Sequence, residues 1–331
     1  MNEAVATTGS DLGAGRRRAR HAVVRVVRGT DSDAIGRLLR RFGLSRAGRR
    51  SLSQSAVLRK IVEALLPSDP LVRRIDLPRI ELVIPCHGKD ERLLRLAILA
   101  ALRCSRNRID RVRLVTPLGD FADLGDLGVP IIVQSDLDLV GRHLLDCVVE
   151  HVPAWRRGWA VQQLVKLQAV ANSDYSGCLV LDADTILLQQ RTWLTNDGTQ
   201  TLIISDEYHE AYVEHADRVW RFPRPPVSFV THHQLMQPAI VRQMFPNGGA
   251  DLEEWIARGD WREGSPVAEY HDYGAWMIER FSDRAVWARW RNRLVRPSDL
   301  RLDSASTSDL WNLLALRFPD SMSVSLHDYL G

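Results

Sequence analysis

The sequence predicts an α/β protein with a mostly parallel sheet flanked by helices, preceded by a basic helical extension. From residue 80 onward, short apolar runs alternate with helical stretches, which is the pattern of βαβ units. The 331 residues are 45% hydrophobic, which is enough for one large core or two modest ones. No run approaches the roughly 18 consecutive apolar residues of a membrane-spanning helix, so we expect no integral membrane enzyme.

The elements follow from this alternation. Strands are expected at the apolar runs 80–84, 111–116, 130–134, 178–181 and 201–205, and helices at 90–102 and 159–171. After residue 223 the regularity fades, and we expect one more strand at 228–231 and helices at 233–245, 251–258 and 267–281. Prolines at 67, 70 and 78 separate a basic, partly disordered helical extension, residues 1–75, from the main domain, residues 76–331.

Charge and cysteine usage give further expectations. Residues 1–70 carry 14 basic and 6 acidic residues, a net charge of +8, whereas the remainder carries −5. Arginine clusters in this extension attract polyanions, and we expect residues 16–60 to contact an anionic membrane surface peripherally. The four cysteines form no C-x-x-C pair, which indicates reduced thiols in a cytoplasmic protein, with peripheral attachment at the inner membrane face as a further expectation.

Two acidic residues follow the most apolar run directly. Asp182 and Asp184 stand one residue apart after residues 178–181. In parallel sheets, ligands bind beyond the carboxyl ends of the strands. Paired carboxylates there suit Mg²⁺ or Mn²⁺, which also bind phosphate oxygens. The alternative is a solvated turn, where aspartate is common.

A polar patch precedes this strand on the helix expected at 159–171. Gln162, Gln163 and Lys166 lie three and four residues apart and therefore share one side of the helix. Such a patch suits an anionic ligand with hydroxyl groups, and the alternative is a solvent-facing stripe. After the first strand, Lys89 is a candidate phosphate contact in a tight turn, although helix capping explains most of that loop.

Two blocks in the second half carry further candidates. His232 and His233 are adjacent, and we expect one to bind a metal or an acceptor and the other to pack. Residues 269–276 combine aromatic rings with Glu269 and Asp272, a mixture typical of sugar pockets in which a carboxylate acts as general base. An amphipathic helix with an aromatic underside fits that block equally well.

Together, five blocks in this order resemble glycosyltransferases of the GT-A class, and most closely a bacterial family of GT-A-like proteins of the DUF6492 type. The blocks are VIPCHGKD at 83–90, GWAVQQLVKL at 158–167, LDADT at 181–185, FVTHH at 229–233 and EYHDYG at 269–274. The resemblance spans about residues 80–281 and leaves out the basic extension. It implies a GT-A, Rossmann-like fold with a nucleotide-binding half, residues 76–205, and an acceptor-side half, residues 206–331.

The resemblance also implies an activity, namely metal-dependent transfer of a sugar from a nucleoside diphosphate sugar to an acceptor hydroxyl. The acceptor would be a saccharide or a lipid-linked glycan in bacterial glycan or glycolipid assembly. The metal, Mn²⁺ or Mg²⁺, would be held by Asp182, Asp184 and a late histidine, for which His327, His232 and His233 are candidates. The donor would be lined by Lys89, Gln162, Gln163 and Lys166, and the catalytic carboxylates would be Glu269, as base of an inverting reaction, and Asp272.

Two other functions fit parts of the sequence. A sugar-phosphate nucleotidyltransferase would share the sheet and the carboxylates, but the loop at 85–90 lacks the Gly, Arg and Lys richness that grips a triphosphate. A non-catalytic protein that binds polyanions or membrane surfaces would use the basic extension. Nucleic acid is disfavoured as a partner because no recognition-helix motif accompanies the charge.

Overall fold

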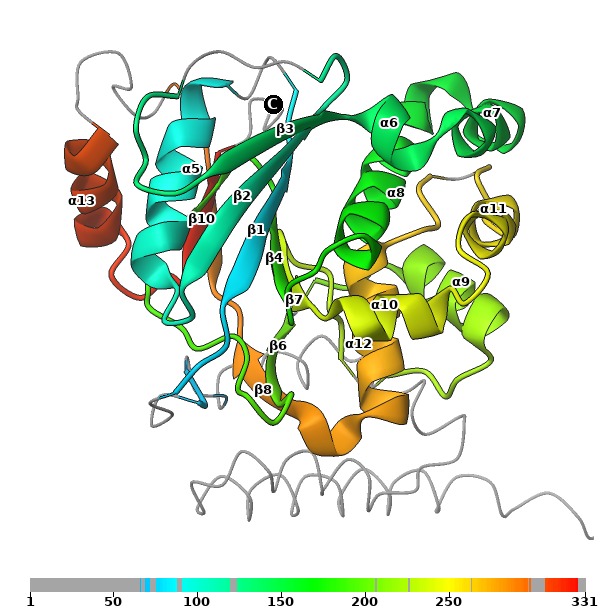
Figure 1. The fold of residues 1–331 in the computed structure, drawn as a ribbon. Helices are drawn as coiled ribbons and strands as arrows, with labels where there is room; N and C mark the ends of the chain where they lie inside the picture. The colour runs from blue at the N-terminus through cyan, green and yellow to red at the C-terminus, as the bar shows by residue number, and fades with distance from the viewer. Residues whose placement is uncertain are drawn as a thin grey trace, which may run out of the picture.

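The structure is a computed structural model that describes residues 66, 69–71, 76–87, 91–119, 124–205, 207–225, 227–262, 264–296, 298 and 307–326. A five-stranded sheet of order β3-β2-β1-β4-β7 forms its centre (Figure 1). Its strands are β1 Ile80–Pro85, β2 Ile109–Thr116, β3 Ile131–Ser135, β4 Cys178–Leu181 and β7 His233–Met236. The first four run parallel, and β7 pairs antiparallel with β4. The predicted fold class, a mostly parallel sheet flanked by helices, is confirmed.

Helices cover both faces of this sheet. On one side lie α5 (Glu91–Cys104) and α13 (Thr307–Arg317), and on the other lies a larger group that includes α8, α10 and α12 (Figure 1). This group comprises α6 Asp136–Val140, α7 Arg142–His151, η2 Ala154–Arg156, α8 Arg157–Ala171, α9 Glu210–Trp220, α10 Pro238–Met244, α11 Gly249–Ala257 and α12 Glu269–Arg280. Each face of the sheet therefore has its own hydrophobic core, and the six residues of β1 are buried on both sides.

Two smaller sheets complete the described part of the chain. The strands β6 (Gln200–Ile204) and β8 (Ala285–Arg289) pair in parallel, and the 3₁₀ turn η3 (Ser282–Arg284) precedes β8. A second small sheet has the order β5-β10-β9 and consists of β5 Thr185–Leu187, β9 Asn292–Val295 and β10 Ser323–Leu326. Because β5 begins directly after Asp184, this sheet brings the end of the described chain, β10, to the carboxyl end of β4.

Most predicted elements are confirmed, but the region around residue 230 is not. Residues 228–231 form no strand, and Ser228 makes only an isolated bridge to Ser205. The helix predicted at 233–245 is wrong in its first half, where the chain forms β7 and α10 starts only at Pro238. The strand was missed because Gln234 is polar and interrupts the apolar pattern. In the structure Gln234 is buried, and its side-chain oxygen accepts a hydrogen bond from the Ile203 amide at 3.1 Å. Proline is well suited to the first turn of a helix, where its missing N–H costs nothing.

All four cysteines are free thiols, and three of them, Cys86, Cys104 and Cys178, are buried. Within the described ranges, every helix is too short or too polar to pass through a bilayer.

Candidate active site

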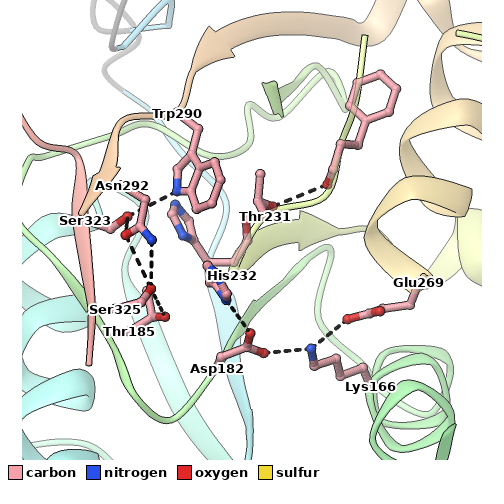
Figure 2. A network of polar contacts seen from close by, with 12 residues as sticks. Lys166, Asp182, Thr185, Thr231, His232, Glu269, Trp290, Asn292, Ser323 and Ser325 are labelled. Carbon is pink, nitrogen blue, oxygen red and sulfur yellow. Dashed lines mark hydrogen bonds and ion pairs between the residues drawn. The ribbon is translucent and has the colours of Figure 1, made fainter. Parts of the chain in front are cut away.

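The candidate site lies where β4 ends, and a buried lysine is at its centre. Lys166 of α8 places its Nζ 2.7 Å from Asp182 Oδ1 and 2.7 Å from Glu269 Oε1 (Figure 2). On the other side of Asp182, His232 Nδ1 lies 3.1 Å from Oδ2. Two consecutive elements, α8 and β4, and the distant start of α12 thus meet at one ammonium group.

The local structure explains how these groups meet. The chain turns after α8 and returns as β4, so α8 runs antiparallel to that strand and Lys166 reaches the residue that follows it. His232 immediately precedes β7, which pairs with β4 so that His233 lies opposite Leu181. The Asp182 amide also donates to the His232 carbonyl oxygen at 3.0 Å. Sheet pairing therefore holds the imidazole beside the carboxylate.

Burial and charge shift the pKa values of these groups. Burial disfavours the charged forms of Asp182 and Lys166, but their attraction outweighs it, so the pKa of Asp182 falls and that of Lys166 rises well above its usual range. Burial also lowers the pKa of His232, yet its bond to Asp182 outweighs this and raises the pKa overall. For Glu269, burial dominates over Lys166 and raises the pKa. The site therefore holds an ionised Asp182–Lys166 pair beside a carboxyl group of raised basicity.

One buried polar atom beside this cluster, Gln163 Nε2, has no hydrogen-bond partner in the described part of the chain. Gln163 is fully buried, and its Oε1 accepts from the Glu269 amide at 3.4 Å. The ring of Tyr270 lies 4.5 Å from Lys166 Nζ, an arrangement that stabilises the ammonium. Buried polar groups in folded proteins almost always have partners, so an unpartnered atom at a strand end is suited to a ligand's hydroxyl group.

Asp184 and the end of β10 lie on the far side of Asp182. Asp184 is half-buried, contributes to the raised pKa of His232, and its carbonyl oxygen accepts from the Leu326 amide at 2.9 Å. His327, the predicted third metal ligand, directly follows Leu326 but lies outside the described residues. Among the residues that are described, no three acidic, histidine or cysteine side chains gather as a metal site would require.

The remaining predicted site residues divide into three groups. Gln162 is half-buried on α8, one turn before Lys166, whereas Lys89 lies outside the described residues. Asp272 is not brought together with Lys166; its two oxygens accept from the indole N–H groups of Trp220 and Trp255, at 2.8 and 3.0 Å. This bonding fits a structural role, and Asp272 does not enter the mechanism proposed below.

The two adjacent histidines lie in different surroundings. His232 belongs to the site, where its ring also lies 5.5 Å from that of Trp290 (Figure 2). His233 packs edge-on against Trp193, and burial lowers its pKa well below the usual value. Tyr270, one of the aromatic residues of the predicted 269–276 block, also lies at the site, beside Lys166.

Comparisons with known proteins add distant similarities. No protein-family model and no curated protein matches this sequence. Among solved structures, the galactosyltransferase LgtC in complex with donor and acceptor sugar analogues is 13% identical, with a TM-score of 0.41, and the match covers 75% of this chain and 87% of LgtC. An active-site mutant of LgtC is 14% identical over the same shares, with a TM-score of 0.42. Mouse xyloside xylosyltransferase 1 is 10% identical, with a TM-score of 0.37, and the match covers 71% of this chain and 92% of that one.

These similarities are too distant to carry an inference about activity, and the DUF6492-type membership stays a prediction. Folds of this kind host many chemistries, so function must be argued from the contacts of the site itself.

Proposed function

We propose that the protein is a glycosyltransferase that moves a sugar from a nucleoside diphosphate sugar to an acceptor hydroxyl. The observation that carries the proposal is the buried Lys166 between Asp182 and Glu269, at the carboxyl end of a parallel strand. Ligands of open α/β sheets bind at this edge. The unpartnered Gln163 Nε2 beside it supplies a polar group for a sugar hydroxyl.

In the proposed reaction, the acceptor oxygen attacks the anomeric carbon of the donor sugar while the bond from that carbon to the phosphate oxygen breaks. In an inverting reaction, Glu269 takes the proton of the acceptor hydroxyl, and the nucleoside diphosphate leaves with the electron pair of the broken bond. The raised pKa of Glu269 favours this role, because a more basic carboxylate accepts a proton more readily. Lys166 positions Glu269 and Asp182 and balances one of their charges.

We propose that a divalent cation, Mn²⁺ or Mg²⁺, binds beside these carboxylates, and donor chemistry and charge support this proposal. Asp182 and Asp184 offer the hard oxygen ligands that these ions prefer, and His327 is the proposed third ligand. The site contains three carboxyl groups, those of Asp182, Asp184 and Glu269, but only one ammonium and one imidazole, those of Lys166 and His232. An anionic diphosphate therefore needs a further positive charge nearby. When bound, the cation would neutralise the charge that develops on the leaving diphosphate.

The test is a thermal-shift screen of nucleoside diphosphate sugars with and without Mn²⁺, followed by assays of donor hydrolysis and transfer. We expect at least one donor to raise the melting temperature, and more so with metal. The Asp184→Asn variant should lose hydrolysis and transfer with a nearly unchanged melting temperature. Asp138→Asn, which removes an exposed carboxylate on α6, serves as the matched control and should keep full activity. Full activity of Asp184→Asn without metal would refute the metal-dependent part of the proposal.

The cellular setting belongs to the same proposal. We propose a cytoplasmic enzyme in bacterial glycan or glycolipid assembly whose residues 16–60 contact the inner membrane face. Those residues lie outside the described part of the chain, so the support is their charge alone. Failure to co-sediment with anionic vesicles at low salt would refute the membrane contact and leave the proposed reaction untouched.

A further inference from the structure

Three side chains, Arg156, Trp159 and Tyr212, lie near the start of α8 and form an aromatic and basic group. Trp159 precedes Lys166 by seven residues, which is two helical turns, so the two side chains share one side of α8. The helix α8 is antiparallel to β4, so its start lies toward the carboxyl end of that strand. Seven residues of helix place Trp159 about 10 Å from Lys166 along the helix axis. Trp159 therefore lies toward the sheet edge at which Asp182 follows β4.

Two contacts hold Trp159 between α9 and the segment that precedes α12. Its Nε1 donates to the Val267 carbonyl oxygen at 3.3 Å, two residues before Glu269. Its ring lies nearly parallel to that of Tyr212 of α9, at an interplanar angle of 4° with 6.4 Å between the centroids. Burial, followed by the charges of Glu269 and Glu207, raises the pKa of Tyr212 to about 12. The phenol is thus a neutral hydrogen-bonding group within electrostatic reach of Glu269.

Arg156 supplies an uncommitted positive charge to this group. Its side chain is half-buried, and its Nε is enclosed without a hydrogen-bond partner among the described residues. The guanidinium lies over the ring of Trp155, 4.6 Å from the centroid, and acts electrostatically on Tyr212. The adjacent Arg157 differs, because its Nε and Nη2 donate to the carbonyl oxygens of Val152 and Val149 at 3.1 and 2.9 Å. The hydrogen-bonding capacity of Arg157 serves the fold, whereas that of Arg156 is left over for an anion.

We propose that Arg156, Trp159 and Tyr212 form an acceptor subsite for a saccharide that carries an anionic group. The subsite rests on the proposed function, since it supplies the acceptor of that reaction. The aromatic rings contact the apolar face of a sugar, and the guanidinium pairs with its carboxylate or phosphate. A saccharide held there directs a hydroxyl toward Glu269. Acidic acceptors are therefore preferred over neutral ones of the same size.

The test uses the full chain without donor and measures saccharide binding by ligand-observed NMR titration. The probes are methyl glucuronide, glucose 6-phosphate and neutral methyl glucoside, so the two anionic arms separate carboxylate from phosphate recognition. We expect at least one anionic probe to bind about tenfold more tightly than methyl glucoside, the effect of one charge-assisted hydrogen bond. Arg156→Gln should remove this preference, Arg156→Lys should keep part of it, and Arg157→Gln should leave it unchanged.

Three outcomes would overturn the subsite: equal affinity for neutral and anionic probes, no detectable binding of either anionic probe, or an equal loss in Arg157→Gln. A melting curve of each variant shows that the fold is intact. Binding of nucleoside diphosphate sugars is measured separately by thermal shift. If anionic saccharides bind but no donor does, the proposed function fails and the saccharide site stands; if donors bind but anionic saccharides do not, only the subsite fails.

Discussion

Replacement of Lys166 by methionine tests the electrostatic centre of the site. Methionine has a similar length but no charge, so Lys166→Met leaves the carboxylates of Asp182 and Glu269 facing each other without the ammonium that now lies 2.7 Å from each. Lys166 and Glu269 are each only 3% exposed, so water cannot replace the lost partner. Removal of one member of a buried ion pair costs about 3–5 kcal/mol. For a chain of this size, that corresponds to a fall in melting temperature of about 4–7 °C.

A double variant separates charge from packing in this experiment. In Lys166→Met with Glu269→Gln, one of the two opposed carboxylates is gone, and we expect part of the lost stability to return. The assay is urea denaturation of the two single variants, the double variant and the wild type, analysed as a double-mutant cycle. If Lys166→Met alone changed the free energy of unfolding by less than about 0.5 kcal/mol, or if Glu269→Gln brought no recovery, the buried ammonium would not be what holds the carboxylates together.

Three further predictions follow from single residues. Glu269→Gln should lose turnover yet bind the donor, as measured by activity and thermal shift; a loss of donor affinity would instead make Glu269 a binding residue. Burial lowers the pKa of His271 to about 4, and neither ring nitrogen has a hydrogen-bond partner within the described chain. Between pH 6.5 and 4 only the unfolded state takes the proton, so the free energy of unfolding should fall by up to about 3 kcal/mol as the pH is lowered. His271→Leu should reduce this fall in pH-dependent urea denaturation, and an unchanged slope would contradict it. Gly274→Ala should destabilise by about 1–3 kcal/mol, because its Cβ would lie 2.2 Å from Phe229 Cγ, whereas Gly158→Ala has no atom within 4 Å and should be neutral or stabilising.

The sequence predicted the sheet better than the site. The apolar runs of β1 to β4 and β6 are short and bounded by turn residues, and the structure has strands at all five. The strand β7 was missed because Gln234 is polar, yet its amide is buried and bonds to the backbone of β6. A strand that buries its polar side chains against another backbone has no alternating pattern, so periodicity could not identify it.

The position of Lys166 was predicted in part. Its helix and its proximity to Asp182 follow from local sequence, because only the end of α8, one turn and β4 separate them. The ion pair with Glu269 does not, since the two residues are 103 positions apart and only the packing of α12 against α8 brings them together. The block at 269–276 shows the same limit in reverse: its carboxylates and aromatic rings suggested a sugar pocket, but Asp272 is bonded to buried indoles.

The full pairing of Lys166 has a consequence for how the site treats anions. An ammonium that already faces two carboxylates contributes little net attraction to a diphosphate, so Lys166 orients the site rather than recruiting the donor. Under the proposals above, a cation at Asp184 attracts the diphosphate and Arg156 attracts an acidic acceptor. Asp184 leads into β5 and Arg156 precedes α8, so the two groups belong to different elements. Donor and acceptor affinity should therefore respond to different variants: Asp184→Asn should weaken only the donor, and Arg156→Gln only the acceptor.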